Sequence, residues 1–160
     1  MIKKTLLTVL ALTTTLGFSI NASAIDWKSE PGAKCQAYYG SQEALINKYA
    51  GGGAFNTSAA NVWVNCPVIR DNATNVNGTA GTWVWINQAT TQSTTCYNRS
   101  SQPGGNNVQT VSGSRAGAGW LYIRPTVSVS LGTYDIYCSL PTRASVRTVL
   151  NSEYPDTNAQ

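Results

Sequence analysis

The chain has 160 residues, with 11 Lys and Arg, 7 Asp and Glu, and no histidine. The lack of histidine excludes serine–histidine and cysteine–histidine nucleophilic systems, H-E-x-x-H metalloproteases and the usual zinc hydrolases. The basic residues are scattered singly, whereas nucleic-acid binding needs a concentrated basic face, so no nucleic-acid partner is expected.

The first 24 residues have the pattern of an export signal. Lys3 and Lys4 form a basic start, residues 6–20 are mostly apolar, and Ala22-Ser23-Ala24 supplies small residues where a signal peptidase cleaves. We therefore expect a signal peptide over residues 1–24 and a secreted or periplasmic mature chain. The apolar run is short and rich in threonine, so no membrane span is expected after cleavage. An uncleaved N-terminal anchor is the alternative.

The start of the mature chain gives weak structural signals. Residues 25–32 are polar apart from one tryptophan and are interpreted as an arm leading into the domain. Residues 35–49 predict a strand and then a short helix near residues 42–49, where helix-forming residues gather. Three glycines at 51–53 would end that helix and form a loop.

From Val62 onward the pattern is that of strands. Val62, Val64 and Cys66 alternate with Trp63 and Asn65, as in a half-buried strand. The proline at 67 cannot donate to a ladder, so we expect an edge position, a bulge or a change of partner there. Further strands are predicted over residues 82–87, 94–98, 108–112, 120–124, 126–131, 133–140 and 145–154, with a flexible loop over residues 112–119.

Many short strands separated by turn residues indicate an all-β fold. We expect an antiparallel β-sandwich, either jelly-roll or immunoglobulin-like, formed by a single disulfide-bonded domain over residues 25–160.

Four cysteines, Cys35, Cys66, Cys96 and Cys138, follow the predicted signal peptide. An even number in an exported chain indicates two disulfides. Of the three pairings, Cys35–Cys66 with Cys96–Cys138 is favoured, because neighbours in a chain of hairpins tend to be neighbours in space. The alternation around Cys66 and Cys138 directs both sulfur atoms into the core.

Two motifs then indicate kinship. "CPVIRD" over residues 66–71 and "YDIYCSLP" over residues 134–141, followed by a strand ending in "NSEY", resemble a group of short exported bacterial proteins. That group pairs a C-P-[VI]-[VI]-[RK]-D strand with a late Y-x-C-x-L-P strand and four cysteines. The resemblance implies the β fold and the disulfides; the group has no assigned activity. This chain departs from it in the loop over residues 112–119 and in "TWVWIN".

Without histidine or free thiols, an enzyme would need paired carboxylates, as in glycoside hydrolysis. No local motif pairs the acidic residues of this chain, and Asp135 alternates with core residues and is expected in solvent. A carboxylate-dependent glycoside hydrolase, which would need Asp71 or Glu43 beside a second acid, is therefore the least favoured hypothesis. We expect no catalytic residue and no cofactor.

The loop that follows Cys66 raises the question of calcium. Asp71, Asn75 and Asn77 offer oxygen ligands, but Ala73 breaks the EF-hand pattern and a single carboxylate gives too little charge. Turn formation explains these residues better, since Asn and Asp tolerate positive φ and Asn-Gly makes a tight reversal. We expect no metal site.

The tryptophans are the main candidates for binding. Trp83 and Trp85 share one face of a strand, and Val84 and Ile86 share the other. If the aliphatic face is core, the two tryptophans are exposed about 7 Å apart, from two residues at ~3.3 Å rise, and form a platform for sugar rings. Residues on neighbouring strands would extend it: Trp63, Trp120 and Tyr122. The alternative, favoured by the usual burial of tryptophan, is that both pack inside.

The sequence thus predicts a non-catalytic binding or surface-interaction protein. Its expected partner is a glycan or another cell-surface component, bound through Trp83, Trp85, Trp120 and Tyr122. A structural, envelope-associated secreted protein without a small ligand is the alternative, and it predicts buried tryptophans.

Overall fold

A computed structural model describes residues 26–49, 51–68, 81–89, 91–102, 104, 107–124 and 133–153. The expected signal peptide, the Asp71 loop and the strand expected over residues 126–131 lie outside these ranges. The described strands are β1 (Asp26–Pro31), β2 (Gln36–Ala37), β3 (Ile46–Tyr49), β4 (Gly53–Asn56), β5 (Val62–Pro67), β6 (Gly81–Gln88), β7 (Ser93–Ser101), β8 (Asn107–Ala116), β9 (Gly119–Ile123), β10 (Thr133–Leu140) and β11 (Ala144–Glu153). Two short 3₁₀ helices accompany them, η1 (Gly32–Lys34) and η2 (Gly40–Leu45).

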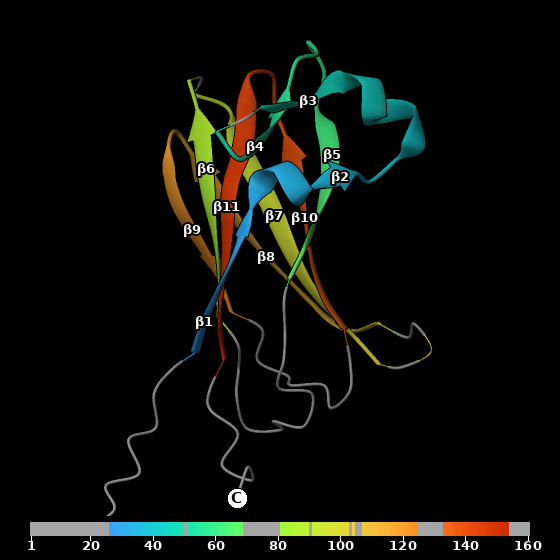
Figure 1. The fold of residues 1–160 in the computed structure, drawn as a ribbon, viewed down its shortest axis with the longest axis vertical. Helices are drawn as coiled ribbons and strands as arrows, with labels where there is room; N and C mark the ends of the chain where they lie inside the picture. The colour runs from blue at the N-terminus through green and yellow to red at the C-terminus, as the bar shows by residue number, and fades with distance from the viewer. Residues whose placement is uncertain are drawn as a thin grey trace, which may run out of the picture.

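The strands form two antiparallel sheets that lie face to face as a β-sandwich (Figure 1). Sheet A has the order β3-β4-β11-β6-β9, with β1 also paired to β11, and sheet B has the order β2-β5-β10-β7-β8. If β4 to β11 are counted from one to eight, sheet A runs 1-8-3-6 and sheet B runs 2-7-4-5. This is the jelly-roll arrangement, so of the two expected sandwich types the structure has the first.

The core between the sheets follows from strand alternation. Every second residue of a strand points to the same face, and the aliphatic members of these sets meet between the two layers. The buried inner-face side chains include Val62, Val64, Val84, Ile86, Leu121, Ile123, Ile136, Leu140, Val146 and Val149. Tryptophan is missing from this core: all five tryptophans are described and none is buried.

Both favoured disulfides are present, with all four cysteines completely buried. Cys96 and Cys138 lie directly opposite each other on β7 and β10, so their bond crosses two paired strands of sheet B. Cys35 follows η1 and is bonded to Cys66 on β5, which ties the segment before β2 to the same sheet.

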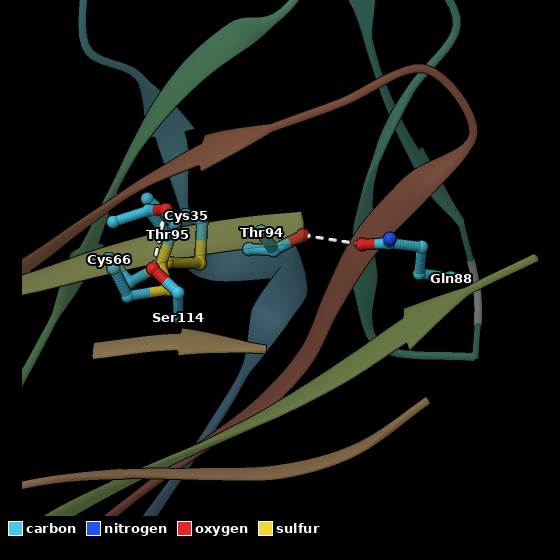
Figure 2. Close-up of a disulfide and its surroundings, with 8 residues drawn as sticks. Cys35, Cys66, Gln88, Thr94, Thr95 and Ser114 are labelled. Carbon is cyan, nitrogen blue, oxygen red and sulfur yellow. Dashed lines mark hydrogen bonds between the residues drawn. A yellow bond between two sulfur atoms is a disulfide. The ribbon is translucent and has the colours of Figure 1, made fainter. Parts of the chain in front are cut away.

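Buried polar side chains bridge the two sheets. The Thr94 hydroxyl of β7 donates to Gln88 Oε1 of β6 over 2.8 Å, and Figure 2 shows this bond crossing between the layers. Farther along the same strands, Asn98 Nδ2 donates to Thr82 Oγ1 over 2.9 Å. These bonds pair buried polar groups across the two sheets, so they help to fix one alignment of the sheets.

Three expectations about elements were wrong. The segment interpreted as an arm is strand β1, which pairs with β11 along its whole length. The short helix expected near residues 42–49 is instead the 3₁₀ helix η2 up to Leu45, followed by strand β3. The loop expected over residues 112–119 belongs mostly to β8, which continues to Ala116 because β7 pairs with it from Ser93 to Ser101.

The proline at the end of β5 occupies an edge position, one of the three arrangements expected for it. Pro67 lies opposite Asp135 of β10, beyond the two residues of β5 that pair with β2. No helix in the described part of the chain is long and apolar enough to span a membrane.

Substitutions at two adjacent residues of β6 test which face of this strand forms the core. Ile86 is completely buried and Asn87 is exposed. Replacing Ile86 by alanine leaves a cavity, so we expect Ile86→Ala to lower the free energy of unfolding by about 2–5 kcal/mol. The matched surface change Asn87→Ala should stay within about 0.5 kcal/mol. Urea denaturation followed by far-UV circular dichroism gives both values, and equal losses would contradict the assigned face.

Candidate functional site

The tryptophans of β6 lie on the outer face of sheet A. Val84 and Ile86 are completely buried, whereas Trp83 and Trp85 are partly accessible on the opposite side of the strand. The aliphatic face is therefore the core, and the interpretation of both tryptophans as interior residues was wrong. Because β6 lies inside the sheet, between β11 and β9, its outer side chains have neighbours on two strands.

Strand β9 supplies the first set of neighbours. Tyr122 lies opposite Trp83, and Trp120 lies opposite Trp85. The ring centroids of Trp83 and Tyr122 are 4.4 Å apart with the planes tilted by 30°. Trp85 and Trp120 meet edge to face at 5.0 Å. Both distances are typical of favourable aromatic pairs, so the register of the two strands builds two ring pairs side by side.

A further tryptophan reaches the same face from β1. Trp27 lies opposite Ser152 of β11, which in turn lies opposite Gly81 of β6. The small side chain of Ser152 leaves room above β11, and the Trp27 ring comes within 4.8 Å of the Trp83 ring. Trp83 therefore has an aromatic neighbour on the β9 side and another on the β1 side. The sequence interpretation missed Trp27, because its strand was taken for an arm.

Gly81 is needed where the rings cover the backbone of β6. A Cβ atom at this position would lie 2.6 Å from Tyr122 Cε2 and 2.9 Å from Trp83 Cη2. Real Cβ atoms do not approach other atoms so closely, so any other residue would displace one of these rings. Glycine thus allows the two rings to lie directly on the strand.

Five rings make up this surface, which we name the aromatic platform: Trp27, Trp83, Trp85, Trp120 and Tyr122. Three of them are well exposed, Trp27 by 52%, Tyr122 by 46% and Trp120 by 40%. The two tryptophans of β6 are partly covered and support the exposed rings from below. The sequence predicted Trp83 and Trp85 as the main exposed rings, but in the structure they mainly support their neighbours. The rings that face solvent are those of Trp27, Trp120 and Tyr122.

Trp63, expected to extend this platform, lies elsewhere. It belongs to β5 in sheet B, where its ring is 5.8 Å from that of Tyr97 and 6.0 Å from that of Tyr137. The outer face of sheet B therefore carries an aromatic cluster of its own.

The described carboxylate side chains are each paired with a cation. Glu30, which is buried, lies 2.6 Å from Lys34 Nζ, and Glu43 lies 3.7 Å from Lys48 Nζ. Asp135 was expected in solvent but is partly buried, where it accepts two hydrogen bonds from the guanidinium of Arg99. The hydrogen bond to Asp135 raises the pKa of Arg99.

Metal ligands do not gather in the described part of the chain: no three Cys, Asp or Glu side chains lie close enough together to hold an ion. The loop residues weighed as calcium ligands, Asp71, Asn75 and Asn77, lie outside the described residues.

Comparison with known proteins gives distant structural likenesses. No protein-family model matches the sequence, and no curated protein matches it. CsCBM6-3 from Clostridium stercorarium, solved in complex with cellobiose, superimposes with a TM-score of 0.45 at 15% identity, covering 76% of this chain and 90% of that one. The Clostridium thermocellum endo-1,4-β-D-xylanase 10B CBM22-1–GH10 modules, complexed with xylohexaose, give 0.46 at 8% identity, over 86% and 29% of the two chains.

A third structure, PfGH50B, gives a TM-score of 0.44 at 10% identity, over 85% of this chain and 23% of that one. This chain thus spans less than a third of the latter two structures. Each TM-score is below 0.5, so these likenesses assign no ligand to this chain.

A substitution at Gly81 tests how the platform is built. In Gly81→Ala the new methyl group meets the Tyr122 and Trp83 rings, so we expect the aromatic bands of the near-UV circular dichroism spectrum to change in sign or intensity. Gly40→Ala is the matched control, because a Cβ atom at Gly40 has no neighbour within 4 Å. An unchanged near-UV spectrum of Gly81→Ala would contradict the close ring packing.

Proposed function

We propose that this protein is a non-catalytic glycan-binding protein and that the aromatic platform is its binding surface. The observation that carries the proposal is the exposure of Trp27, Trp120 and Tyr122 on an open sheet face, above two bracing tryptophans. A large exposed apolar surface of this kind marks a binding site, because it lowers solubility unless a partner covers it.

Sugar rings suit such a surface for physical reasons. A pyranose carries C–H groups on one face and hydroxyls at its rim, so it can stack on an aromatic ring while its hydroxyls remain hydrated. Aromatic side chains provide a large apolar contact area with few torsions to immobilise on binding. The bracing contacts of Trp83 and Trp85 fix the exposed rings further, which reduces the entropy lost on binding.

The residues between the rings indicate an uncharged ligand. The outer-face positions of β11 opposite β6 are Ser152, Leu150 and Thr148, and those of β1 are Ser29 and Pro31. These positions carry no formal charge and offer hydroxyl groups that can donate to or accept from a sugar. A neutral polysaccharide therefore fits this surface better than an acidic one.

The width of the platform suits an extended chain. From Tyr122 on β9 to Trp27 on β1 the surface crosses β6 and β11, which is three strand spacings. The rings draw together over these strands: the Trp83 centroid lies 4.4 Å from that of Tyr122 and 4.8 Å from that of Trp27, so the row of three rings is wider than one sugar ring. We therefore infer that at least two successive sugar units lie across the strands.

The other two hypotheses have less support. A structural protein without a ligand predicts buried tryptophans, and here every one of the five is at least partly accessible. A hydrolase needs two carboxylates free for acid and base chemistry, and in the described part of the chain Glu30, Glu43 and Asp135 are each held by a cation, while Asp71 lies outside it.

Affinity electrophoresis in native gels tests the proposal directly. Gels containing hydroxyethyl cellulose, xyloglucan, arabinoxylan or galactomannan should retard the unmodified protein in at least one case. Trp27→Ala removes one exposed ring, and its affinity should fall by about tenfold, the equivalent of about 1.4 kcal/mol. Trp27→Tyr keeps an aromatic ring and should retain most of the affinity.

Asn87→Ala is the matched control, since Asn87 lies on the outer face of β6 outside the ring cluster. It should bind as the unmodified protein does. If no polysaccharide retards the protein, or if Trp27→Ala binds as well as the control, the proposed site is wrong.

A further inference from the structure

The outer face of sheet B carries a second aromatic surface. Tyr97 of β7 and Tyr137 of β10 lie directly opposite each other, with ring centroids 5.0 Å apart and planes within 8° of parallel. Trp63 of β5 borders both rings, and the Tyr38 ring lies 5.6 Å from that of Tyr137. We name these four residues the tyrosine face: Tyr38, Trp63, Tyr97 and Tyr137.

This surface arises from the same alternation as the platform. Tyr97 follows Cys96 and Tyr137 precedes Cys138, so each tyrosine is adjacent in sequence to a buried cysteine of the Cys96–Cys138 bond. Because that bond occupies the inner face of β7 and β10, the residues adjacent to the cysteines in each strand point outward. The parallel ring pair is therefore fixed by the disulfide behind it.

The exposed ring of the tyrosine face is held by backbone contacts. Tyr38, 40% exposed, donates its N–H to the Trp63 carbonyl over 2.8 Å. The Trp63 N–H in turn donates to Gln42 Oε1, and the Ala37 N–H donates to Glu43 Oε2. The Cys35–Cys66 disulfide, drawn in Figure 2, ties the start of the same segment to β5. The backbone that carries Tyr38 is thus held in place in the absence of a ligand.

The charges beside these rings cancel. Arg99 lies 5.6 Å from the centre of the Tyr137 ring and is bound to Asp135 through both carboxylate oxygens. The pair is part-buried and carries no net charge. Neutral side chains lie opposite the rings in the neighbouring strands: Asn65 beside Tyr137, Ser112 beside Tyr97 and Ser139 beside Trp63. This chemistry matches an uncharged, hydroxyl-rich partner and not an ionic one.

We propose that the tyrosine face is a second binding surface for an uncharged polysaccharide, so that one domain bridges two glycan chains. This inference rests on the proposed function of the aromatic platform. The two surfaces are the outer faces of two stacked sheets and point in opposite directions (Figure 1). A chain bound to one face is therefore separated from the other face by the whole core, and simultaneous binding links two chains.

Bead co-aggregation tests bridging separately from binding. Beads of two colours are coated with whichever polysaccharide of the electrophoresis panel retards the unmodified protein most, and mixed aggregates are counted against protein concentration. The unmodified protein should link the two colours. Tyr38→Ala should require about tenfold more protein for the same linkage, because it loses one exposed stacking ring. Tyr38→Phe keeps the ring and should link beads as the unmodified protein does.

The two single variants distinguish the two proposals. Trp27→Ala and Tyr38→Ala should each reduce bead linkage while still being retarded in the polysaccharide gel, and the double variant should be retarded less and link fewer beads than either single variant. If Tyr38→Ala links beads as well as the unmodified protein, the second surface is refuted while the platform stands. If Trp27→Ala changes nothing and Tyr38→Ala abolishes retardation, the platform proposal fails and bridging fails with it. If no polysaccharide retards the unmodified protein, both proposals fail.

Discussion

The register of β6 between β9 and β11 is the constraint on which the candidate site depends. Val84 lies opposite Leu121 on one side and Val149 on the other, and all three are buried. Because side chains alternate with a period of two, a slip of one residue would move Val84 and Ile86 to solvent and both tryptophans into the core. The aliphatic core thus determines the position of the aromatic rings. The rings contribute in return, since each stacked pair adds roughly 0.5–1.5 kcal/mol beyond its buried area.

Sheet B follows the same rule with disulfides in place of aliphatic pairs. The buried Cys96–Cys138 bond occupies the inner face of β7 and β10, and Tyr97 and Tyr137, each adjacent to one of these cysteines, stack on the outside. In both sheets the tryptophans therefore lie outside a core made mostly of medium-sized side chains. This distribution is unusual for small β domains, in which aromatic residues usually dominate the interior. Stability alone would favour burying such area, so its exposure supports the binding role proposed for both faces.

The sequence predicted the central strands well and the peripheral ones poorly, for a physical reason. In β5, β6 and β10 the apolar alternation is strong because both neighbours are strands and one face is core. In β1 the side chain of Glu30 is buried and forms an ion pair with Lys34. A charged residue therefore occupies a core-facing position, which breaks the apolar alternation that would have predicted a strand. In β8 the Gly113 and Ser114 positions have low strand propensity, and pairing with β7 overrides it. The residues near Glu43 likewise have helix propensity, but in the structure they form the 3₁₀ helix η2 and the strand β3.

The candidate site shows why local patterns give only part of a binding surface. Trp83 and Trp85 are recognisable from their spacing alone, but the exposed rings come from β1 and β9, which are far from β6 in sequence. Trp27 lies opposite the small Ser152 of β11, and the Tyr122 and Trp83 rings lie over Gly81 of β6. Neither Ser152 nor Gly81 attracts attention by itself. Because Ser152 and Gly81 have little or no side chain, the rings of Trp27, Trp83 and Tyr122 can pack close together over the sheet. The small residues therefore determine the form of this surface as much as the tryptophans do.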